Sequence, residues 1–119
     1  MGCALPEAIK YLVRLVHGIA GLPVEAHTHN DFGMAVATEL AAVEAGAACI
    51  HGCANGLGER TGNAPTEELI AALHVLYDYD RQYRLELLPA LGKLVERIDR
   101  LPMPARPARP PSWQSSARS

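Results

Sequence analysis

The sequence lacks long apolar runs, basic clusters and an excess of either charge. No stretch approaches the roughly 20 apolar residues that a membrane-spanning helix requires. No basic segment precedes an apolar core and a cleavage site, so no signal peptide is expected. With 13 acidic and 11 basic residues, the chain has a formal net charge of -2 and offers no basic patch to nucleic acid. We therefore expect a cytoplasmic protein without a membrane or nucleic-acid partner.

Cysteine is also scarce. The three cysteines, Cys3, Cys49 and Cys53, are odd in number, and the last two lie within one predicted strand. A secreted disulfide framework normally has an even number of cysteines. We therefore predict reduced thiols.

The length of the chain allows one modest domain. At 119 residues, 49% of them hydrophobic, the chain can form one core but not two. Residues 102–119 are mostly Pro, Arg and Ser, and this segment is too poor in apolar residues to pack. We predict a folded region over residues 1–101 and a disordered tail over residues 102–119.

Helical and strand-like segments alternate in the predicted folded region. Apolar residues recur at helical spacing in four segments, which are residues 6–17, 33–45, 65–77 and 86–100. Residues 22–27 and 47–53 are short segments predicted to form strands, the second of them buried. This order predicts an α/β fold of right-handed βαβ units with a parallel sheet. In such folds the chemistry gathers at the carboxyl ends of the strands.

Two histidines stand at the end of the first predicted strand. Because side chains alternate along a strand, His27 and His29 share one face and could hold one metal ion. Imidazole suits Zn, Mn, Fe or Co rather than Ca. Histidines of this kind are also common as hydrogen-bonded core residues. Glu25 shares their face deeper in the strand and is expected to make an interior polar contact.

Polar residues follow both predicted strands. Asn30 and Asp31 can cap the next helix or hold a metal-binding imidazole in its correct tautomer. The glycine-rich loop at residues 54–64 is either a flexible connection or a mobile lid over a polar substrate.

The second predicted strand carries a further group of candidate ligands. Cys49, His51 and Cys53 share one face, which suggests a second metal site. Sulfur ligands on a single strand are poorly arranged for tetrahedral closure. We therefore interpret the cysteines as small core residues.

Two segments together resemble the signature of one family. They are HTHNDFGMAVATELAAVEAGA, which begins at His27, and NGLGERTGNAPTEELIAAL, which begins at Asn55. They resemble the metal-dependent acyltransferases that include 2-isopropylmalate, homocitrate and citramalate synthases. This group belongs to a wider set of TIM-barrel proteins, with hydroxymethylglutaryl-CoA (HMG-CoA) lyase and the carboxyltransferase domain of pyruvate carboxylase. The resemblance covers about residues 2–104.

The resemblance implies a partial TIM (β/α)8 barrel, from about helix 5 to helix 8. Residues 1–101 would form the C-terminal part of a pyruvate-carboxyltransferase-like barrel. His27 and His29 would end barrel strand six and bind a divalent metal (Zn, Mn or Mg). Asn63, after strand seven, would approach or join the metal sphere, and Asn30 and Asp31 would support the ligands.

The resemblance also implies a reaction, the Claisen-type condensation of acetyl-CoA with a 2-oxo acid. The metal would polarise the keto oxygen, and thioester hydrolysis would drive the reaction forward. The resemblance gives catalytic roles to two loop residues, Glu59 and Arg60. It gives substrate contacts to four further residues, Thr28, Asn55, Gly56 and Gly58. Full-length relatives are expected to be homodimers.

The chain also departs from the family pattern. The family's Asp-Arg-Glu motif on the first barrel strand, which supplies the third metal ligand, has no counterpart here. The first six residues resemble the middle of the loop after strand five, as in a truncated or frameshifted reading frame. We therefore expect the 119-residue chain to be inactive on its own.

Three alternatives remain open. A lyase of the HMG-CoA type would have a cysteine in the glycine-rich loop and a different pair after the second histidine. The chain instead has Glu59-Arg60 and Asn30-Asp31. An aldolase acting on a 4-hydroxy-2-oxo acid uses comparable metal chemistry, but the NGLGERTGN loop disfavours it. The third alternative is a non-catalytic remnant.

Overall fold

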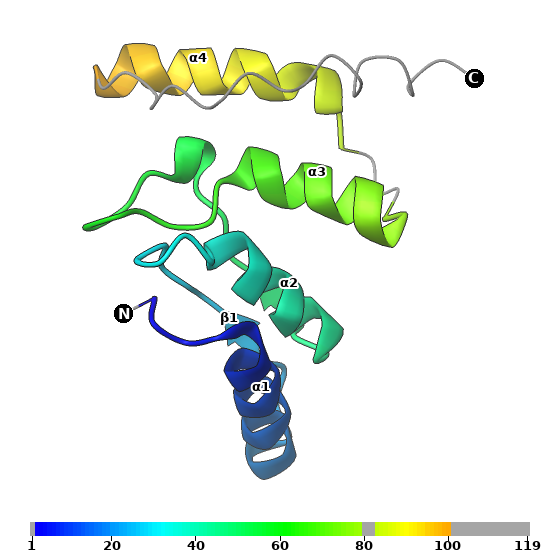
Figure 1. Ribbon diagram of the computed structural model, residues 1–119. Coiled ribbons are helices and arrows are strands. Elements are labelled where there is room, and N and C mark those ends of the chain that lie inside the picture. Colours follow the sequence, from blue (N-terminus) through cyan, green and yellow to red (C-terminus); the bar gives the residue numbers. More distant parts are fainter. Residues whose placement is uncertain (1, 80–82, 101–119) are drawn as a thin grey trace.

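The computed structural model describes residues 2–79 and 83–100. Its helices follow one another from α1 to α4, and a ladder of two short strands lies beside α1 and α2 (Figure 1). The elements in chain order are α1 (Pro6–Ala20), β1 (Glu25–Ala26), α2 (Ala35–Glu44), β2 (Cys49–Ile50), the 3-10 turn η1 (Ala54–Gly56), α3 (Thr66–Tyr77), the 3-10 turn η2 (Leu85–Leu87) and α4 (Leu88–Asp99). The tail predicted to be disordered lies outside the described residues.

The two strands pair in parallel, as the alternating pattern predicts. Glu25 lies opposite Cys49, and Ala26 lies opposite Ile50. The predicted strands were too long, since only two residues of each are regular. Among the described residues, each strand pairs only with the other. Without a further strand to supply backbone hydrogen bonds, the remaining residues of each predicted strand are not regular.

Helix α1 begins at a proline and ends at a left-handed glycine. Pro6 occupies the first turn, where its missing N–H costs nothing. The helix runs through Gly18 and ends before Gly21, which adopts φ 63° and donates its N–H to the carbonyl of His17. The helix is therefore three residues longer than predicted.

Two small apolar clusters form within the core of the described residues. In the first, Val13 of α1 packs with Ala26 of β1 and Ala42 of α2. In the second, Ala35, Ala64 and Leu69 bring together α2, α3 and the loop between β2 and α3. Alanine dominates both clusters, so the helices approach closely but bury little apolar area.

One carboxylate links three helices at the surface. Glu44 of α2 accepts from Lys10 of α1 at 2.6 Å and from the Tyr77 hydroxyl of α3 at 2.5 Å. These two donors hold the pKa of Glu44 below its usual value.

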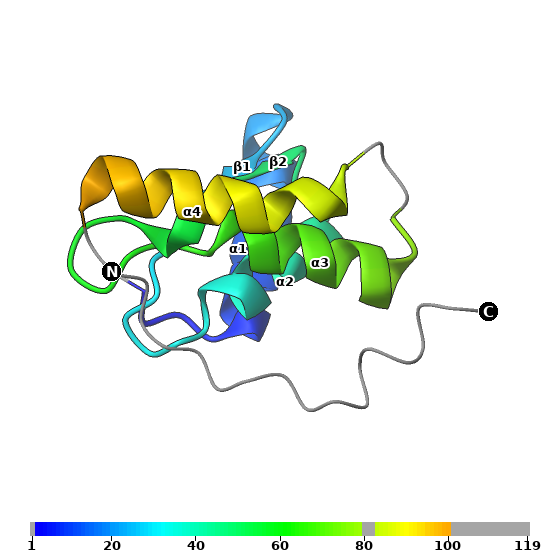
Figure 2. The same cartoon turned by 90° about the horizontal axis from the view of Figure 1, so that it is seen from above.

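Helix α4 lies across the end of the molecule that carries α3 and η1 (Figures 1 and 2). It begins at Leu88, two residues later than predicted, because Leu85–Leu87 form a 3-10 turn. Much of the apolar stripe predicted for it remains exposed, including Leu94 and Ile98. No helix among the described residues is long and apolar enough to cross a membrane.

The prediction that residues 47–53 form a buried strand is wrong. Cys49 and His51 are exposed, and Cys53 is half-buried. The odd-numbered face of the ladder has no covering layer among the described residues, so the cysteines do not serve as core residues.

Candidate functional site

The two histidines follow β1 and pack against each other. The ring centroids of His27 and His29 are 5.2 Å apart, and the ring planes are nearly perpendicular at 89°. His27 is exposed, whereas His29 is half-buried. The Nδ1 atom of His29 is buried and has no hydrogen-bond partner among the described residues. A buried ring nitrogen without a partner is an available donor atom or lone pair.

The glycine-rich loop returns to these histidines and delivers Asn63. The backbones meet in an antiparallel bridge between His29 and Asn63, and the N–H of Asn30 donates to the Gly62 carbonyl at 2.9 Å. The buried Asn63 amide lies 3.2 Å from Nε2 of His27 and donates to the Thr28 carbonyl at 3.0 Å. Residues 36 positions apart in sequence thus meet at one point.

Glycines make this close approach possible. A Cβ on Gly58 would overlap the side-chain oxygen of Asn63, and a Cβ on Gly62 would overlap the Gly56 carbonyl oxygen. Gly56 and Gly62 also have left-handed φ values of 68° and 82°. The loop is closed on itself by hydrogen bonds from Asn63 to Gly56 and from Gly62 to Glu59.

Asp31 joins the two loops by an ion pair. Its carboxylate accepts two hydrogen bonds from the Arg60 guanidinium, both at 3.1 Å, and a third from the Gly2 N–H at 2.7 Å. Arg60, followed by the Gly2 N–H, holds the pKa of Asp31 well below its usual range. Arg60 therefore faces Asp31, while Glu59 is exposed.

The capping role falls to Asn30 rather than Asp31. The side-chain oxygen of Asn30 accepts the N–H of Ala35 at 3.1 Å, at the start of α2. One of the unpaired N–H groups of the first helical turn is thereby satisfied. The sequence suggested the same roles for Asn30 and Asp31, but in the structure Asn30 caps α2 and Asp31 pairs with Arg60.

Thr28 makes its side-chain hydrogen bonds with α2. Its N–H and hydroxyl both donate to Oε1 of Glu39, at 2.7 and 2.8 Å, and its hydroxyl also accepts from Thr38. Glu39 is fully buried. Burial raises the pKa of Glu39, and the hydrogen bonds from Thr28 offset part of that rise.

The sequence interpretation missed Glu39. Its position gave a usable signal, because it lies four residues after Ala35 and three before Ala42, both of which are fully buried. Residues at these spacings share one face of a helix. A carboxylate on the apolar face of a helix requires a specific partner.

Asn55 links η1 to α4. Its side-chain amide donates to the Gly92 carbonyl at 3.0 Å, and its backbone N–H donates to the Glu67 carboxylate. The residue adopts a left-handed φ of 57°. The side-chain amide of Asn55, which was expected to contact substrate, is therefore already engaged in a hydrogen bond to α4.

Replacing Asn55 should loosen α4. The Asn55→Gly change keeps the left-handed backbone accessible and removes only the amide, so we expect a loss of about 1 kcal/mol. The Asn55→Ala change should cost roughly 1 kcal/mol more, because alanine disfavours positive φ. Hydrogen exchange over residues 88–99 should accelerate in both variants. Unchanged exchange in Asn55→Gly would contradict a tethering role.

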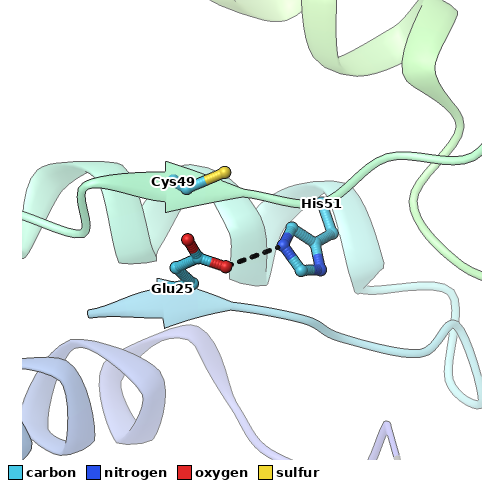
Figure 3. A group of neighbouring side chains, drawn as sticks. All are labelled: Glu25, Cys49 and His51. Atoms are coloured by element: carbon cyan, nitrogen blue, oxygen red, sulfur yellow. Dashed lines mark ion pairs between the residues drawn. The ribbon is translucent and has the colours of Figure 1, made fainter. Parts of the chain in front are cut away.

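A third group of side chains lies on the open face of the strand ladder (Figure 3). Glu25 and His51 form an ion pair at 3.4 Å, and the Sγ atom of Cys49 lies nearby. Nδ1 of His51 also lies 3.3 Å from Nδ1 of His27. The polar contact expected of Glu25 exists, but it is not interior, because the Glu25 side chain is 65% exposed.

A small open cavity of about 100 Å³ adjoins the histidines. Its lining includes Gly2, Ile9, Thr38 and the segment from His27 to His29. The cavity is much smaller than the roughly 300 Å³ at the lower limit of usual small-molecule pockets.

Residues 1–95, most of the chain, match the HMGL-like family. The chain belongs to the HMGL-like family. It is 48% identical over 99 residues to a probable 2-isopropylmalate synthase of Methanopyrus kandleri, a match that covers 83% of this chain and 20% of the relative. It is 42% identical over 108 residues to (R)-citramalate synthase of Methanocaldococcus jannaschii, covering 91% of this chain and 22% of the relative. A homocitrate synthase of M. kandleri is 43% identical over 108 residues, covering 91% and 27% respectively.

Solved structures of other HMGL-like proteins share the fold. An HMG-CoA lyase of Bacillus subtilis superposes with a TM-score of 0.73 at 28% identity, over 88% of this chain and 37% of the lyase. The carboxyltransferase domain of Rhizobium etli pyruvate carboxylase gives a TM-score of 0.72 at 28% identity, over 87% of this chain and 19% of that chain. The family expected from the two sequence motifs is confirmed, and this chain spans 20–27% of the length of the curated relatives described above.

Proposed function

We propose that this HMGL-like chain contributes half of the metal and substrate site of an acetyl-CoA-dependent condensing enzyme. In this proposal the chain forms the segment from helix 5 to helix 8 of a TIM barrel. The reaction joins acetyl-CoA to a 2-oxo acid. The observation that carries the proposal is the meeting of His27, His29 and Asn63 at the ends of neighbouring strand segments.

These residues fit a divalent cation. Two imidazoles and one amide converge from two loops, and one ring nitrogen of His29 is buried without a partner among the described residues. His27, His29 and Asn63 would hold the ion, which leaves positions open for further ligands. Such an ion acts as a Lewis acid on a carbonyl oxygen.

The neighbouring residues orient this site. Asn63 positions the His27 ring through its amide, and Asn30 fixes the turn that presents His29. The Asp31–Arg60 pair joins the two loops from the side. In the proposal, Glu59 and Arg60 act at the mouth of the site, while Thr28, Asn55, Gly56 and Gly58 shape the loops that face the substrate.

Identity to relatives favours a synthase over a lyase. The three curated synthases described above are 42–48% identical to this chain, whereas the B. subtilis lyase is 28% identical. The Glu59-Arg60 pair and the absence of cysteine from the loop point the same way.

The metal site is tested on the full chain by calorimetric titration with Mn²⁺. We expect His29→Ala and His27→Ala each to weaken binding at least about tenfold, because each removes a ligand. His74→Ala is the matched control, since His74 is exposed on α3 and belongs to neither loop that carries the proposed ligands. Equal affinity in the His29→Ala and His74→Ala variants would contradict the proposal.

The condensing reaction is tested in a chimera. Residues 2–95 of this chain replace the matching segment of the M. kandleri 2-isopropylmalate synthase, and release of free CoA is followed with 2-oxo acids. We expect CoA release that is lost in the His27→Ala chimera. A folded, metal-binding chimera without turnover would instead support the non-catalytic remnant.

A further inference from the structure

We propose that Glu25, Cys49 and His51 form a second metal site, suited to Zn²⁺ or Co²⁺. It lies beside the His27–His29 pair, since His51 contacts His27 at 3.3 Å, but shares no ligand with it. The three side chains come from both strands of the ladder and lie on its open face (Figure 3). Their ligand atoms all lie within 4.8 Å of one another.

Strand register explains how Glu25 meets Cys49 and His51, which are distant from it in sequence. Parallel pairing puts Glu25 directly opposite Cys49, so their side chains leave the ladder on the same face. His51 lies two residues beyond Cys49 and therefore shares that face as well. The second strand segment thus supplies Cys49 and His51, and the first strand supplies Glu25 from across the ladder.

The distances suit tetrahedral coordination. Oxygen and nitrogen ligands bound at about 2.0–2.1 Å in a tetrahedron lie about 3.3–3.4 Å apart. The Oε2 atom of Glu25 and the Nε2 atom of His51 are 3.4 Å apart. A sulfur bound at about 2.3 Å should lie about 3.6 Å from each. The Cys49 sulfur lies within 4.8 Å of both atoms, so it needs to approach them by up to about 1.2 Å.

The donor set selects the kind of ion. A thiolate, an imidazole and a carboxylate together suit Zn²⁺ and Co²⁺, whereas Ca²⁺ and Mg²⁺ prefer oxygen ligands alone. Three protein ligands leave a fourth position open to water. Side chains that are 65% exposed at Glu25 and 44% exposed at His51 leave the ion room to enter from solvent.

Titration of the full chain with Co²⁺ under reducing conditions tests the site. A thiolate bound to Co²⁺ gives a charge-transfer band in the near ultraviolet, and we expect its final intensity to correspond to one thiolate-bound ion per chain. The Cys49→Ser variant should lose the band. The Cys3→Ser/Cys53→Ser double variant, in which Cys49 is the only cysteine left, should keep it.

Two further variants separate this site from the proposed function. His29→Ala should weaken the other site but keep the charge-transfer band, because His29 is not one of the three ligands and packs against His27. His51→Ala should weaken Co²⁺ binding at least about tenfold while far-ultraviolet circular dichroism stays native. A band that survives Cys49→Ser, or a wild-type chain with native circular dichroism and no band, would overturn the proposal.

Discussion

Replacing Gly62 by alanine should unfold the loop that carries Asn63. The backbone at Gly62 is left-handed, with φ 82°, and an added Cβ would overlap the carbonyl oxygen of Gly56. Left-handed strain and a backbone overlap together should lower the free energy of unfolding by about 2–4 kcal/mol. Metal affinity at His27 and His29 should fall about 10- to 100-fold, although no ligand is changed. Urea unfolding and Mn²⁺ titration measure the two effects.

Gly46 provides the matched control for this change. It also has a positive φ, 93°, but a Cβ there would meet nothing within 4 Å. The Gly46→Ala variant should therefore lose only about 1 kcal/mol and bind Mn²⁺ as the wild type does. Equal losses of stability in the two variants would show that the overlap with Gly56 is relieved at no cost.

Truncating Glu39 should be the second large perturbation. The Glu39→Ala change removes the acceptor for both the N–H and the hydroxyl of Thr28 and leaves a cavity beneath α2. Unsatisfied buried donors cost about 1–3 kcal/mol each, so we expect a loss of roughly 2–4 kcal/mol in unfolding free energy. Because Thr28 lies between the two histidines, metal binding should weaken as well.

The Glu39→Gln variant separates hydrogen bonding from charge. Its amide oxygen still accepts from Thr28, so its stability should stay near that of the wild type. Burial raises the pKa of Glu39 above its ordinary value of 4.5. The stability from this group is therefore fully present below pH 4.5 and is lost as the pH rises through the raised pKa.

The stability difference between Glu39→Gln and the wild type should accordingly shift in favour of the variant as the pH rises. Urea unfolding over a pH series measures this difference. A difference that stays constant, or that shifts toward the wild type, would mean that the buried carboxyl is not the titrating group.

The sequence predicted the elements of the fold better than their extent. Helical periodicity identified the four helices because apolar spacing is a local property. The strands were shorter than expected, since their length depends on neighbouring strands that periodicity does not reveal. Exposure of Cys49 and His51 was missed for the same reason, because burial of a strand face depends on what covers it.

For the candidate site, the sequence predicted the residues but not their partners. The His27–His29 spacing and the glycine loop indicated which side chains would gather. Arg60 pairing with Asp31, Asn55 turning toward α4 and Glu39 accepting from Thr28 depend on contacts between segments distant in sequence. The Glu25–Cys49 juxtaposition likewise depends on strand register, which local pattern does not fix when strands are this short.

The backbone bridge between His29 and Asn63 also bears on motion. The Asn30 N–H and the Gly62 carbonyl bind one loop to the other, so neither can open while the other stays closed. The two loops should behave as one cooperative opening unit, with the amides of Asn30 and Asn63 exchanging at the same free energy. A ligand bound to either loop would then slow the opening of both loops.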